Sequence, residues 1–248
     1  MADVPYGPCE RQRIDFWRSH SNAPAPIVVY IHGGGFYSGD KNYIPPHILL
    51  GSLDAGLAVA SINYRLSNEV KFPVFMHDAG RAIQFLRSQA KAWNINPARI
   101  AASGDSAGGG ISLWLGFHPD LVDPDSPDQV LRQSTRLTCL GVINTQCSYD
   151  PHFYREIGLG PAAEHKFMPP FYGLTHDQMD TPEARQMFRD AAPMTWFHSC
   201  GPPVFIYSPN KDEPLPYGVG AQRACEAGQP VNAVDTLAGR AVHHPKMS

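Results

Sequence analysis

The sequence predicts an α/β protein with a doubly wound, mostly parallel sheet and helices on both faces. Short apolar runs alternate with longer segments of helical pattern along the first half of the 248-residue chain. Such alternation is typical of parallel sheets, because a connection between two parallel strands must cross back over the sheet, usually as a helix. A chain of this length can bury one sizeable core, so we expect a single domain over residues 1–248.

Local patterns predict the individual elements. Residues 12–17 alternate polar and apolar side chains, which predicts an antiparallel edge strand with one covered face. Uninterrupted apolar runs predict strands buried between helix layers, while proline entries and apolar stripes predict helices. The further predicted strands are 27–31, 57–62, 100–102, 137–143, 203–207 and 231–237, and the predicted helices are 45–53, 74–93, 111–117 and one beginning at Thr181. Residues 119–128 are acidic and proline-rich, and we expect a solvated linker there.

Composition and charge exclude several classes of function. The formal net charge is −3 and no basic run is present, which argues against a nucleic-acid surface. No apolar stretch reaches the roughly eighteen residues of a membrane span. Five cysteines without a Cys-x-x-Cys pair, and a start without signal-peptide features, favour a cytoplasmic protein; a secreted form with its signal removed would read the same. The histidines lack metal-ligand spacing and the glycine clusters lack phosphate-loop residues, so we expect neither metal nor cofactor.

The chemistry-bearing stretch is Gly104-Asp105-Ser106-Ala107-Gly108, between a predicted strand and a predicted helix. Gly-x-Ser-x-Gly in this setting is the nucleophile-elbow pattern. A serine at the tip of such a turn has a strained backbone, and side chains at the flanking glycine positions would clash with neighbouring elements. We therefore expect Ser106 to be the nucleophile. The N–H of Ala107, free at a helix N-terminus, is an expected oxyanion donor.

A second glycine cluster, HGGGF at residues 32–36, directly follows the predicted strand 27–31. An HGGG loop after an early strand and an elbow after a later one form a two-part oxyanion machinery. We expect the N–H groups of Gly34 and Gly35 to be donors, with Gly33 as a further candidate. His32 is expected to brace the loop by hydrogen bonds, and Asp105 to orient the elbow.

These two motifs resemble those of the hormone-sensitive-lipase-like carboxylesterases of the α/β-hydrolase superfamily, and of their smaller feruloyl-esterase-like (BD-FAE-type) and acetyl-esterase-like relatives. The resemblance is specific over about residues 11–112 and patchier beyond. It implies an α/β-hydrolase fold, with a small lid-like insertion at about 148–174, where aromatic residues gather. Only about thirty residues precede the HGGG loop, which favours the compact branch without an N-terminal helical cap.

The resemblance also implies an acid and a histidine, in that order after the serine. Asp212 takes the place of the family's aspartate, which a proline follows four residues later, as Pro216 does here. Glu213 is the second candidate for the acid. Asp150, after the preceding predicted strand, is the third.

His243 is the first candidate for the base and His244 the second. Both follow the predicted last strand, from which a histidine can fold back over the sheet toward the serine Oγ. The chain departs from the family here, because a closing helix usually follows the family's Gly-x-x-His segment whereas this sequence stops at Ser248. Some relatives carry a His-His-Pro segment earlier, and in that register the true histidine lies beyond this terminus.

Together these residues predict a serine carboxylester hydrolase that acts through an acyl-enzyme on small or carbohydrate-linked esters. The expected partner is a small-molecule ester, and the oligomeric state stays open. An arylformamidase-like amide hydrolase is one alternative. The other is a non-catalytic ligand-binding protein on a decayed hydrolase fold, as in the plant gibberellin receptors, which gains weight if no histidine reaches Ser106.

Overall fold

The structure is a computed structural model that describes residues 1–158, 163–207 and 235–236. The strands are β1 (Val4–Pro5), β2 (Arg13–Trp17), β3 (Ala25–Ile31), β4 (Ala58–Ile62), β5 (Ile95–Asp105), β6 (Leu140–Ile143), β7 (Val204–Tyr207) and β8 (Asp235–Thr236). The α-helices are α1 (Pro46–Asp54), α2 (Val74–Ser88), α3 (Ala90–Trp93), α4 (Ala107–Phe117), α5 (Pro151–Glu156), α7 (Met168–Tyr172) and α8 (Pro182–Ala191). Short 3-10 turns are η1 (Lys41–Tyr43), η2 (His176–Gln178) and η3 (Pro193–Trp196).

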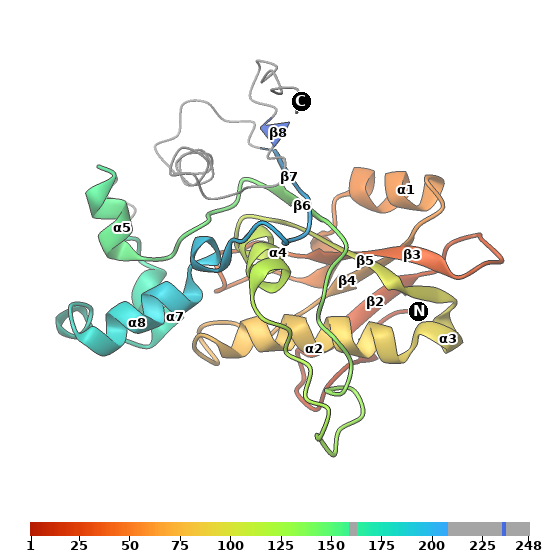
Figure 1. Cartoon of the computed structure of the whole chain (residues 1–248), viewed down its shortest axis with the longest axis horizontal. Helices are drawn as coiled ribbons and strands as arrows, with labels where there is room; N and C mark the ends of the chain where they lie inside the picture. Colours follow the sequence, from red (N-terminus) through yellow and green to blue (C-terminus); the bar gives the residue numbers. More distant parts are fainter. Residues whose placement is uncertain (159–162, 208–234, 237–248) are drawn as a thin grey trace.

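The strands form one sheet in the order β1-β2-β4-β3-β5-β6-β7-β8 (Figure 1). Every neighbouring pair from β4 to β8 is parallel, whereas the β1–β2 and β2–β4 pairs are antiparallel. The predicted mostly parallel sheet is confirmed. The antiparallel strand predicted at 12–17 is also confirmed, although β1 pairs with its outer side and β2 is therefore not the edge.

The strand order reverses between β3 and β5. The chain passes from β3 to β4 on one side and then returns to place β5 on the other side of β3. In doubly wound sheets ligands bind at such a switch point, in the crevice beyond the carboxyl ends of the strands. Ile31, the last residue of β3, pairs with Gly104 near the end of β5. The register therefore brings the HGGG loop and the serine turn together.

The alternation of side chains along β3 divides the core between the two faces of the sheet. Val29 and Ile31 belong to the large apolar cluster that includes α2 and α4 residues, whereas Tyr30 belongs to a smaller cluster packed against α1. Figure 1 shows α1 on the opposite side of the sheet from α2. All 11 residues of α4 are buried. The helix that follows Ser106 is therefore central to the core.

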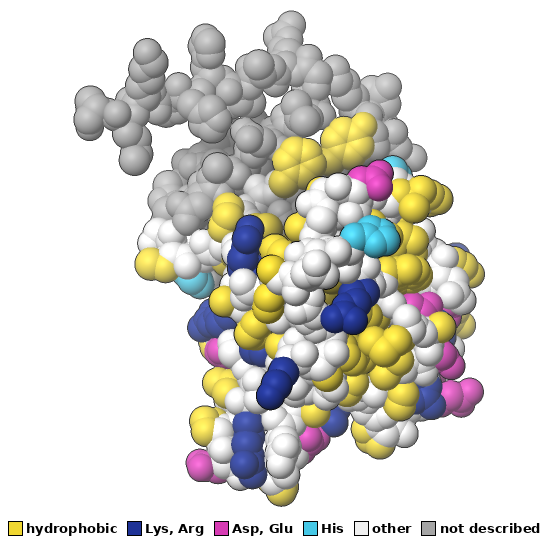
Figure 2. Space-filling model, turned by 90° about the vertical axis from the view of Figure 1, so that its right-hand side faces the viewer, with side chains coloured by type: hydrophobic (Ala, Val, Ile, Leu, Met, Phe, Trp, Pro, Cys, Tyr) yellow, Lys and Arg dark blue, Asp and Glu magenta, His cyan; other side chains and the backbone are white. Residues whose placement is uncertain are grey.

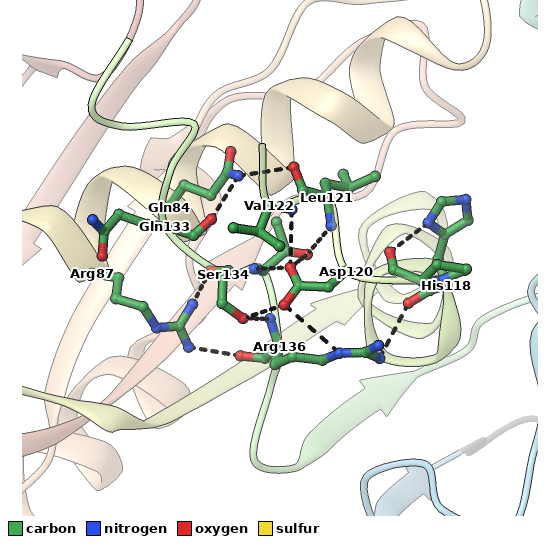
Figure 3. Close-up of polar contacts among 11 residues, drawn as sticks. Gln84, Arg87, His118, Asp120, Leu121, Val122, Gln133, Ser134 and Arg136 are labelled. Atoms are coloured by element: carbon green, nitrogen blue, oxygen red, sulfur yellow. Dashed lines mark hydrogen bonds and ion pairs between the residues drawn. The ribbon is translucent and has the colours of Figure 1, made fainter. Parts of the chain in front are cut away.

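Two predicted segments differ in detail. The helix predicted over 74–93 is divided into α2 and α3 at Gln89, a break that the apolar spacing does not reveal because Ala90 continues it. The predicted linker 119–128 is exposed over much of its length, yet it is anchored. Asp120 accepts hydrogen bonds from the Ser134 hydroxyl at 2.6 Å and the Thr135 N–H at 2.7 Å (Figure 3).

Two side chains of α2, Gln84 and Arg87, hold the segment between Leu121 and Arg136. The Gln84 amide nitrogen donates to the carbonyls of Leu121, at 3.3 Å, and Gln133, at 2.8 Å. Arg87 donates to the Arg136 carbonyl at 2.8 Å. Composition correctly indicated a solvated loop but gave no sign of this anchoring, because the partners lie far away in the sequence.

Two features of the structure concern the classes that the composition argues against, namely nucleic-acid-binding and membrane-spanning proteins. Basic side chains on the face in Figure 2 stand singly among apolar and polar ones, rather than as the continuous patch that nucleic-acid-binding proteins present. Across the described residues, no helix combines the length and apolarity that crossing a bilayer requires.

Close packing at the end of β3 explains both glycines of the elbow. A Cβ at Gly108 would lie 1.9 Å from the carbonyl oxygen of Ile31 and 2.6 Å from that of His32. A Cβ at Gly104 would lie 2.6 Å from the same Ile31 oxygen and 2.5 Å from the carbonyl carbon of Gly108. Because backbone atoms at these distances cannot give way cheaply, both positions require glycine.

We expect Gly108→Ala to lower the free energy of unfolding by about 3 kcal/mol or more, since the added methyl group must displace β3 or α4. Urea unfolding measures the change. The matched control is Gly51→Ala inside α1, where a Cβ would meet nothing within 4 Å. This control should raise stability by about 0.5–1 kcal/mol, because alanine favours a helix interior over glycine. A Gly108→Ala protein as stable as the wild type would contradict the packing described here.

Candidate active site

Ser106 lies at the sharp turn between β5 and α4. Its backbone has φ 48° and ψ −120°, a conformation that costs a non-glycine residue of order 1–3 kcal/mol. The surroundings hold it in place: the Ser106 N–H donates to the Ile143 carbonyl at 2.9 Å, and the Ser106 carbonyl accepts from the Thr145 hydroxyl at 3.0 Å. The side chain is partly exposed. This is the geometry that the Gly-x-Ser-x-Gly pattern predicts for an elbow.

Left-handed backbone conformations shape the HGGG loop. Gly34 has φ 105°, Gly35 has φ 61°, and Phe36 has φ 62°. The Gly34 carbonyl accepts from the N–H groups of Tyr37 and Ser38, both at 3.0 Å, which closes the turn. The loop therefore reverses direction immediately after β3, beside the serine turn.

The N–H groups of this region divide into engaged and available donors. Gly33 N–H donates to Asp105 Oδ1 at 3.2 Å, so this further candidate for the oxyanion hole already has an acceptor. In the described part of the chain, no group accepts a hydrogen bond from the N–H of Gly34, Gly35 or Ala107. These are the three donors that the sequence favours, and Ala107 is the first residue of α4, where helix N–H groups lack internal partners.

Asp105 joins the two motifs directly. Its Oδ1 accepts both the Gly33 N–H and, at 2.6 Å, the hydroxyl of Tyr30 on β3. The expectation that Asp105 orients the elbow is consistent with these bonds, but the sequence did not single out Tyr30. Its only signal is a hydroxyl-bearing side chain within an otherwise aliphatic strand. Thr145, which binds the Ser106 carbonyl, carried no signal at all.

His32 lies beneath the loop with its ring fully buried. The ring stacks on Tyr64 with centroids 4.4 Å apart, and Nδ1 lies 2.8 Å from the Gly33 carbonyl, which it can reach only as an N–H donor. Burial lowers the pKa of His32 from 6.5 to about 4, an effect that the hydrogen bond to Gly33 only partly offsets. His32 is therefore neutral at physiological pH and suits the expected bracing role.

Of the candidates for the acid and the base, only Asp150 is among the described residues. Asp212, Glu213, His243 and His244 lie outside the described residues. The third acid candidate, Asp150, caps α5 by accepting from the His152 N–H at 2.8 Å. A capping role gives that carboxylate a structural explanation. Among the described residues, no group of three or more His, Cys, Asp or Glu side chains is arranged to hold a metal ion.

The shifted pKa of His32 makes stability depend on pH. The unfolded chain takes up a proton on this residue near pH 6.5, while the folded protein resists it until about pH 4, so stability falls as the pH drops through that window. His32→Asn keeps a donor in place of Nδ1 and removes the titration. Between pH 6.5 and about 5 the wild type should lose about 1.5 kcal/mol more stability than this variant, measured by urea unfolding. Equal losses would show that His32 does not titrate in this way.

Comparisons with known proteins agree with this geometry. The BD-FAE family model matches residues 15–222. Esterase LipQ of Mycobacterium tuberculosis is 26% identical over 87% of this chain, and carboxylesterase NlhH of the same species is 35% identical over 40% of it. The chain spans about half of LipQ, 49% of its length, and 31% of NlhH.

Solved structures share the fold. The acetyl ester-xyloside bifunctional hydrolase of Caldicellulosiruptor lactoaceticus matches with a TM-score of 0.71 and 24% identity, over 88% of this chain and 74% of that one. A truncated carbohydrate esterase from gut microbiota matches with a TM-score of 0.73 and 20% identity, over 96% and 86% of the two chains. The fold is that of the α/β-hydrolases. Since the family model covers most of the sequence, the chain belongs to the BD-FAE family.

Proposed function

We propose that this protein is a serine carboxylester hydrolase. The observation that carries the proposal is the position of Ser106, held at positive φ in a turn that lies against the HGGG loop. Three backbone N–H groups without acceptors among the described residues belong to these same two segments. The esterase and carboxylesterase names of the relatives favour an ester over the amide of an arylformamidase-like enzyme, and favour catalysis over ligand binding alone.

In the proposed reaction the Ser106 oxygen attacks the ester carbonyl carbon while His243 takes the serine proton. Negative charge develops on the carbonyl oxygen and is stabilised by the N–H groups of Gly34, Gly35 and Ala107. The alcohol leaves with the proton from His243. Water, deprotonated by the same histidine, then attacks the acyl-enzyme; the bond between the acyl carbon and the Ser106 oxygen breaks, His243 returns the proton to that oxygen, and the acid is released.

The other members of the site follow from the family pattern. Asp212 would accept a hydrogen bond from the histidine, fixing its tautomer and stabilising the imidazolium. Small or carbohydrate-linked esters are the proposed substrates, a class supported by the acetyl ester-xyloside hydrolase and carbohydrate esterase among the structural neighbours. No cofactor is part of the proposal. The four described cysteines are free thiols, which supports a cytoplasmic location.

Residues 148–174 are the proposed lid of this single domain. Phe167 supports the role: its ring lies 2.5 Å from where a Cβ of Gly35 would be, and it stacks on Tyr37 with centroids 5.7 Å apart. Deeper in the segment, Phe171 is buried and packs edge-on against Phe36 at 4.7 Å. One part of the segment thus joins the core while another reaches the oxyanion loop.

Ser106→Ala should abolish both hydrolysis of 4-nitrophenyl acetate and labelling by a fluorophosphonate. In the labelling reaction the serine oxygen bonds to phosphorus, fluoride leaves, and the serine proton passes to the base, so an unactivated serine reacts negligibly. Thermal unfolding should stay nearly unchanged, because the elbow depends on its glycines. Hydrolysis within tenfold of the wild-type rate would remove Ser106 from the proposed role.

His243→Ala should lower kcat nearly as far as Ser106→Ala does, because triad members act as a unit. The wild-type rate should fall as the pH drops below roughly 6–7, the pKa range in which an imidazole base becomes protonated. His32 does not account for such a profile, since its pKa lies near 4. His244→Ala is the matched control and should be much milder. If both variants match an almost inert wild type, the chain lacks its base and the binding-protein alternative gains support.

A further inference from the structure

The carboxylate of Asp105 lies between the serine turn and the oxyanion loop. Asp105 is the last residue of β5 and directly precedes Ser106. Its Oδ1 receives the Tyr30 hydroxyl at 2.6 Å and the Gly33 N–H at 3.2 Å. Because Tyr30 is on β3, one carboxylate oxygen connects two neighbouring strands and the loop that follows one of them.

We propose that Asp105 and Tyr30 are positioning residues that set the direction of the oxyanion donors, a role that rests on the proposed esterase function. Binding of the Gly33 N–H fixes the His32–Gly33 peptide plane, which directly precedes the peptide plane that carries the Gly34 N–H. The orientation of that plane limits where the next two N–H groups, those of Gly34 and Gly35, can point. The hydrogen bond to Asp105 thus makes the Gly33 N–H unavailable to the oxyanion and orients the N–H groups of Gly34 and Gly35.

Tyr30 supports the carboxylate from a rigid position. It is 2% exposed, and burial, its hydrogen bond to Asp105 and the negative charge of that residue raise the pKa of its phenol. The hydroxyl therefore remains a donor at every pH used for an assay. A bare carboxylate beside the hole would repel the developing oxyanion, and two donors on one oxygen reduce that repulsion while holding the side chain still.

Substitutions at both residues separate positioning from a merely structural role. Asp105→Ala removes both hydrogen bonds, Tyr30→Phe removes only the hydroxyl, and Asp105→Asn retains an oxygen that can accept both. The control is Asp120→Ala, because the Asp120 carboxylate likewise accepts both hydroxyl and backbone N–H donors, those of Ser134, Thr135 and Val122, but lies beyond the opposite end of α4 from Ser106. It should lose stability and keep its activity.

The readouts are kcat and KM for 4-nitrophenyl acetate, and the rate of fluorophosphonate labelling. Asp105→Ala should lower kcat and the labelling rate by about 100-fold, while KM changes by less than about threefold, because misdirected donors act mainly on the charged transition state. Tyr30→Phe should cost about tenfold, and Asp105→Asn should recover activity to within about fivefold of the wild type. This pattern supports positioning.

Three results would overturn the proposal. One is an Asp105→Ala protein that reacts as fast as Asp120→Ala. Another is a loss that appears in KM alone, which would assign the bridge to substrate binding. If Asp105→Ala does not fold, Tyr30→Phe decides, and wild-type rates in that variant reject the role. These outcomes leave the esterase function intact, whereas a wild-type protein that neither hydrolyses the ester nor takes up the probe removes that function and the positioning role together.

Discussion

The whole site depends on how closely the turn around Ser106 approaches the end of β3. Two carbonyl oxygens, those of Ile31 and His32, occupy the space where side chains of residues 104 and 108 would project. With hydrogen atoms at those positions, the turn can lie directly against the strand. The same approach brings together two loops separated by 72 residues, as the Gly33–Asp105 hydrogen bond shows. The absence of side chains at residues 104 and 108 permits this close approach, and hydrogen bonds such as the one between Gly33 and Asp105 then hold it.

Around this contact, the described part of the site relies on backbone dipoles supported by neutral side chains. His32 carries no charge near neutral pH, and Tyr64 donates its hydroxyl to the His32 carbonyl at 3.0 Å. Oriented N–H groups stabilise a developing anion without reorganising, so a rigid and neutral support suits them. Asp105 is the charged exception, and its oxygen receives two donors.

The sequence predicted the order of strands and helices well, because buried parallel strands are uninterrupted apolar runs and the elbow has a strict glycine requirement. It kept Gly33 as a further candidate beside Gly34 and Gly35, since consecutive glycines carry identical N–H groups and only the folded chain shows that Asp105 engages the first. The sequence did not single out Tyr30, because its hydrogen-bond partner Asp105 lies 75 residues away. The acid and base rest on family pattern, as Asp212 and His243 lie outside the described residues, while Asp150 proves to be a helix cap.

Because α4 is completely buried, the position of Ser106 at its N-terminus depends on the packing of the core. A helix with a solvent-facing side can fray or detach by itself, but this one has none. Local opening of a protein begins in segments with few buried contacts, and α4 is the reverse of such a segment. Beyond the first turn, whose N–H groups lack partners within the helix, we therefore expect its amide hydrogens to be among the slowest to exchange. We therefore expect the position of the nucleophile to be lost together with the fold on heating.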